Sequence, residues 1–123
     1  MNTIHATPAP KDAKVYIISP SPGEIVTSPV TVRFGLVNMG VAPAGVDKKN
    51  TGHHHLLVDV KNLPAMDKPV PSDKQHIHFG GGQTQVVLEL PKGKHTVQLL
   101  LGDKNHVPHT PPVMSEKVTF TVQ

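Results

Sequence analysis

Hydrophobic and polar residues alternate along most of the chain from Lys14 onwards. The alternation is clearest in residues 29–36, where valine, phenylalanine and leucine occupy every second position. Successive side chains of a strand point to opposite faces, so this period of two predicts strands with one buried face. The same pattern recurs at residues 15–18, 53–60, 86–90, 97–101 and 118–122. A convincing helical stripe is absent from every stretch of 11 or more residues.

The spacing of these segments predicts the fold class. Clusters of proline and glycine separate them, and about seven short strands with turns every 8–12 residues are typical of an antiparallel sandwich. We therefore expect an all-β protein, an immunoglobulin-like antiparallel β-sandwich of about seven strands. Residues 14–123 are expected to form this single domain, after a flexible N-terminal lead of residues 1–13.

Three irregular segments interrupt the pattern. Residues 38–52 and 61–75 are longer than a hairpin connection needs, and residues 102–115 contain three prolines. Loops of about 15 residues are uncommon in a compact domain and are often functional. All three segments flank histidines, which directs attention to the chemistry of that residue.

Composition excludes several classes of function. The 123 residues include 13 Pro, 10 Gly and 9 His but no Cys, which excludes disulfides, thiolate zinc sites and iron–sulfur clusters. A net charge of +3 and only four aromatic residues, 3 Phe and 1 Tyr, do not suggest a nucleic-acid surface. Without a run of about 18 apolar residues, no membrane span is expected. The N-terminus also lacks the basic and apolar regions of a signal peptide.

Histidine is the residue whose placement indicates chemistry. His53 and His55 share one strand face, His76 and His78 repeat this arrangement, and the proline-rich segment carries a third pair. Imidazole is the commonest metal ligand in proteins, so we predict a metal site at one edge of the sandwich. The candidate ligands are His53, His55, His76, His78, His106, His109, Met39 and Met114.

The candidate set favours copper. Met39 and Met114 lie in or beside irregular segments, and a mixture of imidazole and thioether ligands favours copper over zinc. Zinc is the alternative cofactor, because Asp59 and Asp103 are available as carboxylate ligands.

Other features of the sequence have structural interpretations. His54 shares the phase of the core residues and is expected to be buried and hydrogen-bonded, and His95 is also expected to be structural. His5, in the lead, is expected to have no specific role. The glycines at 80–82 are expected to allow close backbone approach at the edge of the site. The sequence contains neither a nucleophile elbow nor a His-Glu-x-x-His motif.

Several long motifs resemble a known family. They are NTGHHHLLVD at residues 50–59, HIHFGGGQT at 76–84, LGDKNHVPH at 101–109 and PPVMS at 111–115. Together they resemble a bacterial family of small exported domains of unknown function, over about residues 34–122. Members of that family usually carry an export signal, so the resemblance implies a periplasmic or secreted protein. Residues 18–32 are similar to the first strands of many bacterial immunoglobulin-like domains.

These observations support three hypotheses about function. The first is a periplasmic metal-binding protein, most readily a copper protein, that buffers, transports or delivers the ion, with another envelope protein as metal donor or acceptor. The second is a cell-envelope interaction module that binds no metal. The third is a mononuclear metalloenzyme, which would need an open position on the ion. Elemental analysis of protein purified without an affinity tag separates the second hypothesis from the others.

Overall fold

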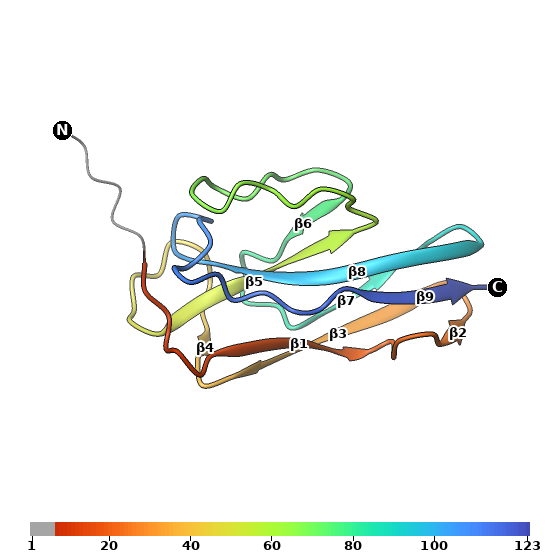
Figure 1. Cartoon of the computed structure of the whole chain (residues 1–123), viewed down its shortest axis with the longest axis horizontal. Helices are drawn as coiled ribbons and strands as arrows, with labels where there is room; N and C mark the ends of the chain where they lie inside the picture. Colours follow the sequence, from red (N-terminus) through yellow and green to blue (C-terminus); the bar gives the residue numbers. More distant parts are fainter. Residues whose placement is uncertain (1–6) are drawn as a thin grey trace.

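The computed structural model describes residues 7–123, so His5 lies outside the described residues. Strands connected by turns and loops make up the fold (Figure 1). No segment within 7–123 forms an apolar helix of the length that crossing a membrane requires. The longer strands are β1 (Lys14–Ser19), β3 (Val30–Val37), β5 (Thr51–Val58), β8 (Gly93–Gly102) and β9 (Val118–Val122). The shorter ones are β2 (Ile25–Val26), β4 (Gly40–Val41), β6 (His76–His78) and β7 (Gln85–Leu88).

The strands form two sheets. One has the order β1-β3-β7, and the other has the order β2-β9-β8-β5-β4, with β6 pairing to a second part of β5. All pairs are antiparallel except the short pairs β2–β9 and β4–β5. The prediction of an all-β fold with two sheets of antiparallel strands, consistent with a β-sandwich, is therefore confirmed. The immunoglobulin-like connectivity stays a prediction.

The main hydrophobic core lies between the two sheets. Val32 and Phe34 of β3 face Leu56 of β5, Leu99 of β8 and Phe120 of β9 across it, and all are almost completely buried. These residues occupy the inward phase that the alternation predicts. Their burial fixes the register of β5, and a slip of one residue would exchange its two faces.

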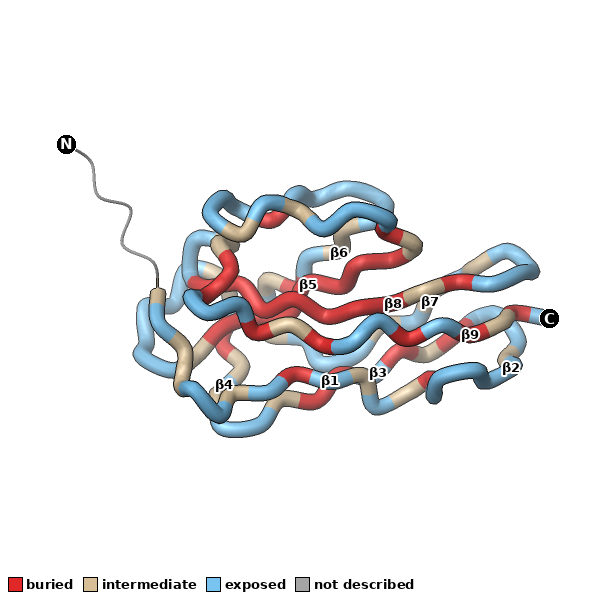
Figure 2. The backbone as a smooth tube through the Cα atoms, in the orientation of Figure 1, coloured by how far each residue is buried: buried red, intermediate tan, exposed pale blue. Residues whose placement is uncertain are grey.

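Strands β5 and β8 are buried on both faces (Figure 2). The other sheet covers their inner face. On the outer face, loop residues cover a second apolar cluster, formed by Leu57, Val60, Val70 and Leu100 with Met66 and Met114 packed against it. The loops therefore shield part of the outer face of this sheet from solvent, and polar side chains on that face can be buried beneath them.

The lead contacts the loop that follows β8. The Thr7 hydroxyl donates a hydrogen bond of 2.7 Å to the Asp103 carboxylate, and the backbone N–H of Thr110 donates to the Thr7 carbonyl at 2.9 Å. Pro8 forms a parallel bridge with Thr110. Thr7 and Pro8 are thus bound to this loop. A domain boundary at residue 13 stays a prediction.

Candidate metal centre

Strand alternation and pairing bring histidines from two strands onto one face. On β5, His53 and His55 point to the outer face, because His54 between them shares the inner phase of Leu56. In the antiparallel pair β5–β6, His78 lies directly opposite His55 and therefore joins the same face.

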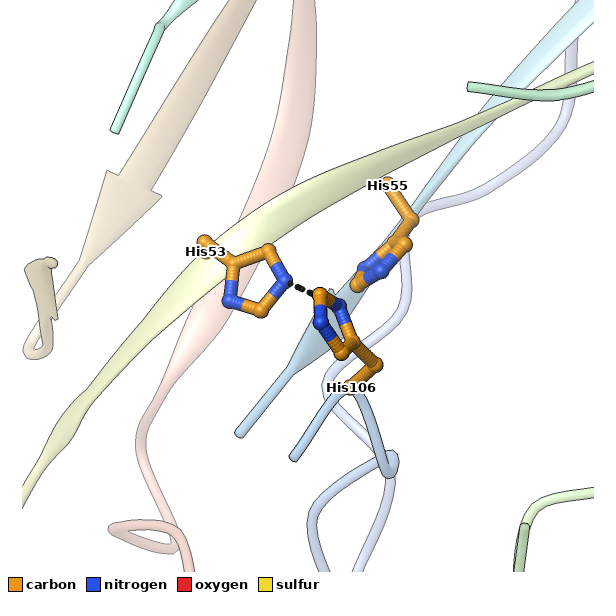
Figure 3. Close-up of side chains that lie close together, drawn as sticks. All are labelled: His53, His55 and His106. Carbon is orange, nitrogen blue, oxygen red and sulfur yellow. Dashed lines mark hydrogen bonds between the residues drawn. The ribbon is translucent and has the colours of Figure 1, made fainter. Parts of the chain in front are cut away.

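A fourth imidazole comes from the loop after β8. Gly102, the last residue of β8, pairs with His53, and the chain then turns so that His106 returns over β5. We call His53, His55, His78 and His106 the four-histidine cluster. Figure 3 shows His53, His55 and His106 turned toward one another.

The four rings have the spacing of a tetrahedral metal site. The centroids of all six ring pairs lie between 4.6 and 5.7 Å apart. A metal–nitrogen distance of about 2 Å with tetrahedral angles places ring centres about 5 Å apart. His53, His55 and His106, which we call the triad, also offer ring nitrogens within 4.8 Å of one another. The closest contact joins His53 Nε2 and His106 Nδ1 at 3.0 Å, where one of the two donates a proton to the other.

Burial keeps two rings of the triad neutral. His53 and His55 are almost completely buried, and neither ring nitrogen of His55 has a hydrogen-bond partner within residues 7–123. Burial, followed by repulsion from neighbouring histidines, lowers the pKa of His55 to about 3 and that of His53 to about 4. A metal ion needs the neutral imidazole, so both rings are in the ligating form at neutral pH.

Asp103 shapes the turn that carries His106. Its carboxylate accepts hydrogen bonds from the N–H groups of Asn105 at 2.8 Å and Val107 at 3.0 Å, and its carbonyl accepts one from His106 at 2.9 Å. His106 adopts a left-handed backbone with φ 66°. Burial opposes ionisation of Asp103, but the bonds from Thr7, Asn105 and Val107 outweigh it and lower the pKa of its carboxyl. Asp103 therefore positions a candidate ligand, and its oxygens are engaged rather than available to an ion.

The three irregular segments meet around the cluster. Val70, from the loop before β6, donates its N–H to the His106 carbonyl at 2.8 Å. Ala44 donates to the Gly80 carbonyl at 2.8 Å, and Gly45 donates to the Lys104 carbonyl at 3.1 Å. The cluster is thus held by loops that are far apart in the sequence.

Glycines make room for the rings. A Cβ atom on Gly102 would lie 2.5 Å from Cε1 and 2.9 Å from Nδ1 of His55. On Gly80 it would overlap Nε2 of His78 and lie 2.6 Å from Cε1 of that ring. The expected close approach at 80–82 is therefore confirmed at Gly80. The role of Gly102 was not predicted, although a glycine in a strand is a signal of close approach.

The other predicted ligands lie elsewhere. His76 Nδ1 bonds the Asp73 carboxylate at 2.8 Å, outside the cluster. His109 is buried against Gly52, on the inner face of β5, with Nε2 at 3.3 Å from the Thr51 carbonyl oxygen. Of the methionines, Met39 packs against the main core and Met114 against the outer apolar cluster. The structure thus brings together four of the eight predicted residues, namely His53, His55, His78 and His106.

His54 corrects one expectation. It is fully buried, as its phase predicts, with its ring 5.0 Å from that of Phe34. However, neither of its nitrogens has a hydrogen-bond partner in the described part of the chain, so the expected hydrogen bonds are wrong. The ring lies in the main core, where its neighbours are aromatic and aliphatic side chains that cannot accept a hydrogen bond. Burial lowers its pKa to about 4.

His95 is structural, as expected. Its Nδ1 lies 2.8 Å from the Asp59 carboxylate and its Nε2 lies 2.7 Å from the Pro91 carbonyl. Both partners are acceptors, so the surroundings favour the imidazolium, in which both ring nitrogens donate. Burial favours the neutral form, but Asp59 and Pro91 outweigh it and raise the pKa of His95. Asp59 also accepts from the N–H of Thr96 at 2.8 Å, so this carboxylate is engaged rather than available as a zinc ligand.

Comparison with known proteins gives a family without an assigned activity. A family model described as a domain of unknown function (DUF4399) matches residues 32–123. Neither a curated protein nor a solved structure matches the chain. The four-histidine cluster is therefore the feature from which a function can be inferred.

Proposed function

The chain belongs to this family of unknown function, and from that premise we propose that it is a copper-binding protein that buffers, carries or delivers the ion. The triad of His53, His55 and His106 supplies the ligands. One observation carries the proposal, namely three imidazoles whose nitrogens lie within 4.8 Å of one another, two of them on almost completely buried rings. Leaving a buried nitrogen without a partner costs about 1–3 kcal/mol, which an ion bound there would recover.

The ligand set supports copper over zinc. All members of the triad are imidazole nitrogen donors. Of the two candidate carboxylates, Asp103 is engaged in the turn that carries His106, and Asp59 is engaged beside His95. For nitrogen ligands, affinity among divalent first-row ions is highest for copper.

We also propose a periplasmic or secreted location and another envelope protein as metal donor or acceptor. The support for both is the motif resemblance to small exported domains. A buffering or delivery role needs an ion that exchanges, and His106, unlike His53 and His55, is only half-buried.

The decisive experiment compares two substitutions on adjacent residues. His55→Phe keeps an aromatic ring but removes both candidate nitrogens, while His54→Phe makes the same change on the opposite face of β5. Both variants remove unpartnered buried nitrogens, so both are expected to be at least as stable as the wild type without metal.

Copper and zinc are titrated into tag-free protein against a chelator of known affinity. We expect one copper ion per wild-type chain, and a loss of about a hundredfold or more in affinity for His55→Phe alone. Equal binding by His55→Phe and the wild type would overturn the proposed site. A wild type that binds no metal would instead support an interaction module.

A mononuclear metalloenzyme is a second candidate. It is favoured by the convergence of three nitrogens rather than four, since three protein ligands and one open position are typical of catalytic sites. Exchangeable water on the bound ion, detected by pulsed electron paramagnetic resonance, would support an enzyme. A shell closed by a fourth imidazole would count against it.

A further inference from the structure

We infer that His78 is a switchable fourth ligand, which rests on Gly80 and turns toward the triad when an ion binds. The site would then alternate between an open form with three imidazoles and a closed form with four. This inference rests on the proposed function, because it needs an ion at the triad.

The ring of His78 is already at the right place. Its centroid lies 4.6 Å from that of His106, 5.3 Å from that of His53 and 5.6 Å from that of His55. These distances are close to the separation of about 5 Å between imidazoles on one tetrahedral ion. Rotation about the Cβ–Cγ bond leaves the ring centre almost in place, so the switch is a rotation of the ring that redirects its nitrogens toward the triad.

The ring nitrogens of His78 are what is misplaced. They do not join the group of nitrogens within 4.8 Å that the triad forms, and Nε2 occupies the space that a Cβ atom on residue 80 would need. A side chain at residue 80 would exclude the ring from this position. The carbonyl of Gly80 accepts a hydrogen bond of 2.8 Å from the N–H of Ala44. The backbone against which the His78 ring rests is therefore fixed in place.

Exposure gives His78 a role in exchange. His78 is exposed, whereas His53 and His55 are almost completely buried and His106 is half-buried. An exposed ligand is the first to meet an incoming ion and the first that an acceptor can replace. The open form therefore suits a partner that offers one imidazole or thioether to the ion.

Two matched pairs of variants test the inference. His78→Ala removes the switchable ligand, and His76→Ala removes the other histidine of the same strand, whose ring bonds Asp73. Gly80→Ala blocks the resting position, and Gly81→Ala adds the same methyl group beside the flexible side chain of Gln83. Neither glycine has a positive φ, so alanine fits both backbones.

Copper affinity, the rate of copper transfer to a chelator, and the number of coordinated imidazoles from nitrogen hyperfine couplings are measured for each variant. We expect four imidazoles in the wild type and three in His78→Ala, with affinity lower by about tenfold. Gly80→Ala should raise the affinity by about threefold and slow transfer, because it empties a competing position. His76→Ala and Gly81→Ala should match the wild type.

The outcomes separate the inference from the function on which it rests. If the wild type binds no copper, the proposed function fails. If it binds copper and His78→Ala matches His76→Ala in affinity and imidazole count, the triad stands and the switch is wrong. If Gly80→Ala binds no more tightly than Gly81→Ala, the resting position is wrong. Should Gly80→Ala fail to fold, the histidine pair alone decides.

Discussion

Buried histidines lie at the two ends of β8, His95 on β8 itself and His55 on the neighbouring strand β5, and their pKa values are shifted in opposite directions. At the beginning of the strand, both ring nitrogens of His95 donate to acceptors, and the pKa of the ring is raised. At the far end, beside Gly102, His55 has no partner for either nitrogen and its pKa falls to about 3. His55 is the more deeply buried of the two and also has no acceptor, so burial holds its ring neutral and free to ligate, whereas at His95 the acceptors outweigh burial and favour the charged ring.

The two histidine sites also affect the free energy of unfolding in opposite directions. His95 has its hydrogen bonds in the folded chain and adds to its stability. The four-histidine cluster leaves buried nitrogens unpaired and reduces stability until a ligand occupies them. An ion that binds only the folded chain would reverse this, by about 3 kcal/mol at a free concentration one hundred times the dissociation constant.

Acid should have the largest effect, and it acts at the cluster end. An unfolded imidazole titrates near pH 6.5, whereas burial holds the pKa of His54 and of His53 at about 4. Between these values the unfolded chain binds more protons, so the free energy of unfolding falls as pH falls from 6.5 towards 4. The share of His54 is about 2 kcal/mol at pH 5, and the cluster adds to it.

Urea unfolding of the wild type and His54→Phe at pH 7.5, 6 and 5 measures this share. The variant should lose about 2 kcal/mol less than the wild type on acidification to pH 5. Parallel losses in the two proteins would show that the buried ring does not stay neutral.

Gly102→Ala should have an intermediate effect at the same end. The new Cβ would lie 2.5 Å from Cε1 of His55 and 3.3 Å from Cα of His106, so the ring and the turn must both shift. We expect a destabilisation of about 1–3 kcal/mol and weaker copper binding. The matched control is Gly40→Ala, also in a strand, where the nearest atom is Thr51 Cγ2 at 3.5 Å. Unfolding and titration that are unchanged in Gly102→Ala would refute the close packing.

His95→Gln should have the smallest effect, with the opposite pH dependence. The raised pKa means that the folded chain binds the extra proton, so the stabilisation is complete below pH 6.5 and is lost as pH rises through the folded pKa. We expect the variant to be less stable by about 1 kcal/mol at pH 6 and nearer to the wild type at pH 9. Thermal unfolding at the two pH values measures this. A difference that grows with pH would contradict the imidazolium.

Strand phase was enough to predict part of the site. The period of two places His53 and His55 on the face opposite His54, and the register with β6 adds His78. Strand phase could not show that His78 joins the cluster and His76 does not. The His76 ring bonds the carboxylate of Asp73, three residues earlier, and so lies outside the cluster. That interaction depends on a local turn rather than on alternation.

The position of His106 depends on contacts that sequence spacing does not encode. Its turn is built on the buried carboxylate of Asp103, which is held by the hydroxyl of Thr7, and the His106 carbonyl accepts from the N–H of Val70. Thr7 and Val70 come from distant parts of the chain. Likewise, β2 and β4 have two residues each and are too short to show a period. The alternation therefore predicted the sandwich and the larger strands, but not the loop contacts that complete the cluster.

The glycines beside the rings offer a way to sort relatives of this protein. Histidine alone would be an insufficient criterion, because a ring needs empty volume as well as a position on a strand. A relative that retains His53, His55 and His106 but carries a larger residue at Gly102 should lack the pocket for the His55 ring. A substitution at Gly80 should instead leave a binding protein whose ion exchanges at a different rate. Two small residues would thus divide the family into non-binding, slowly exchanging and rapidly exchanging members.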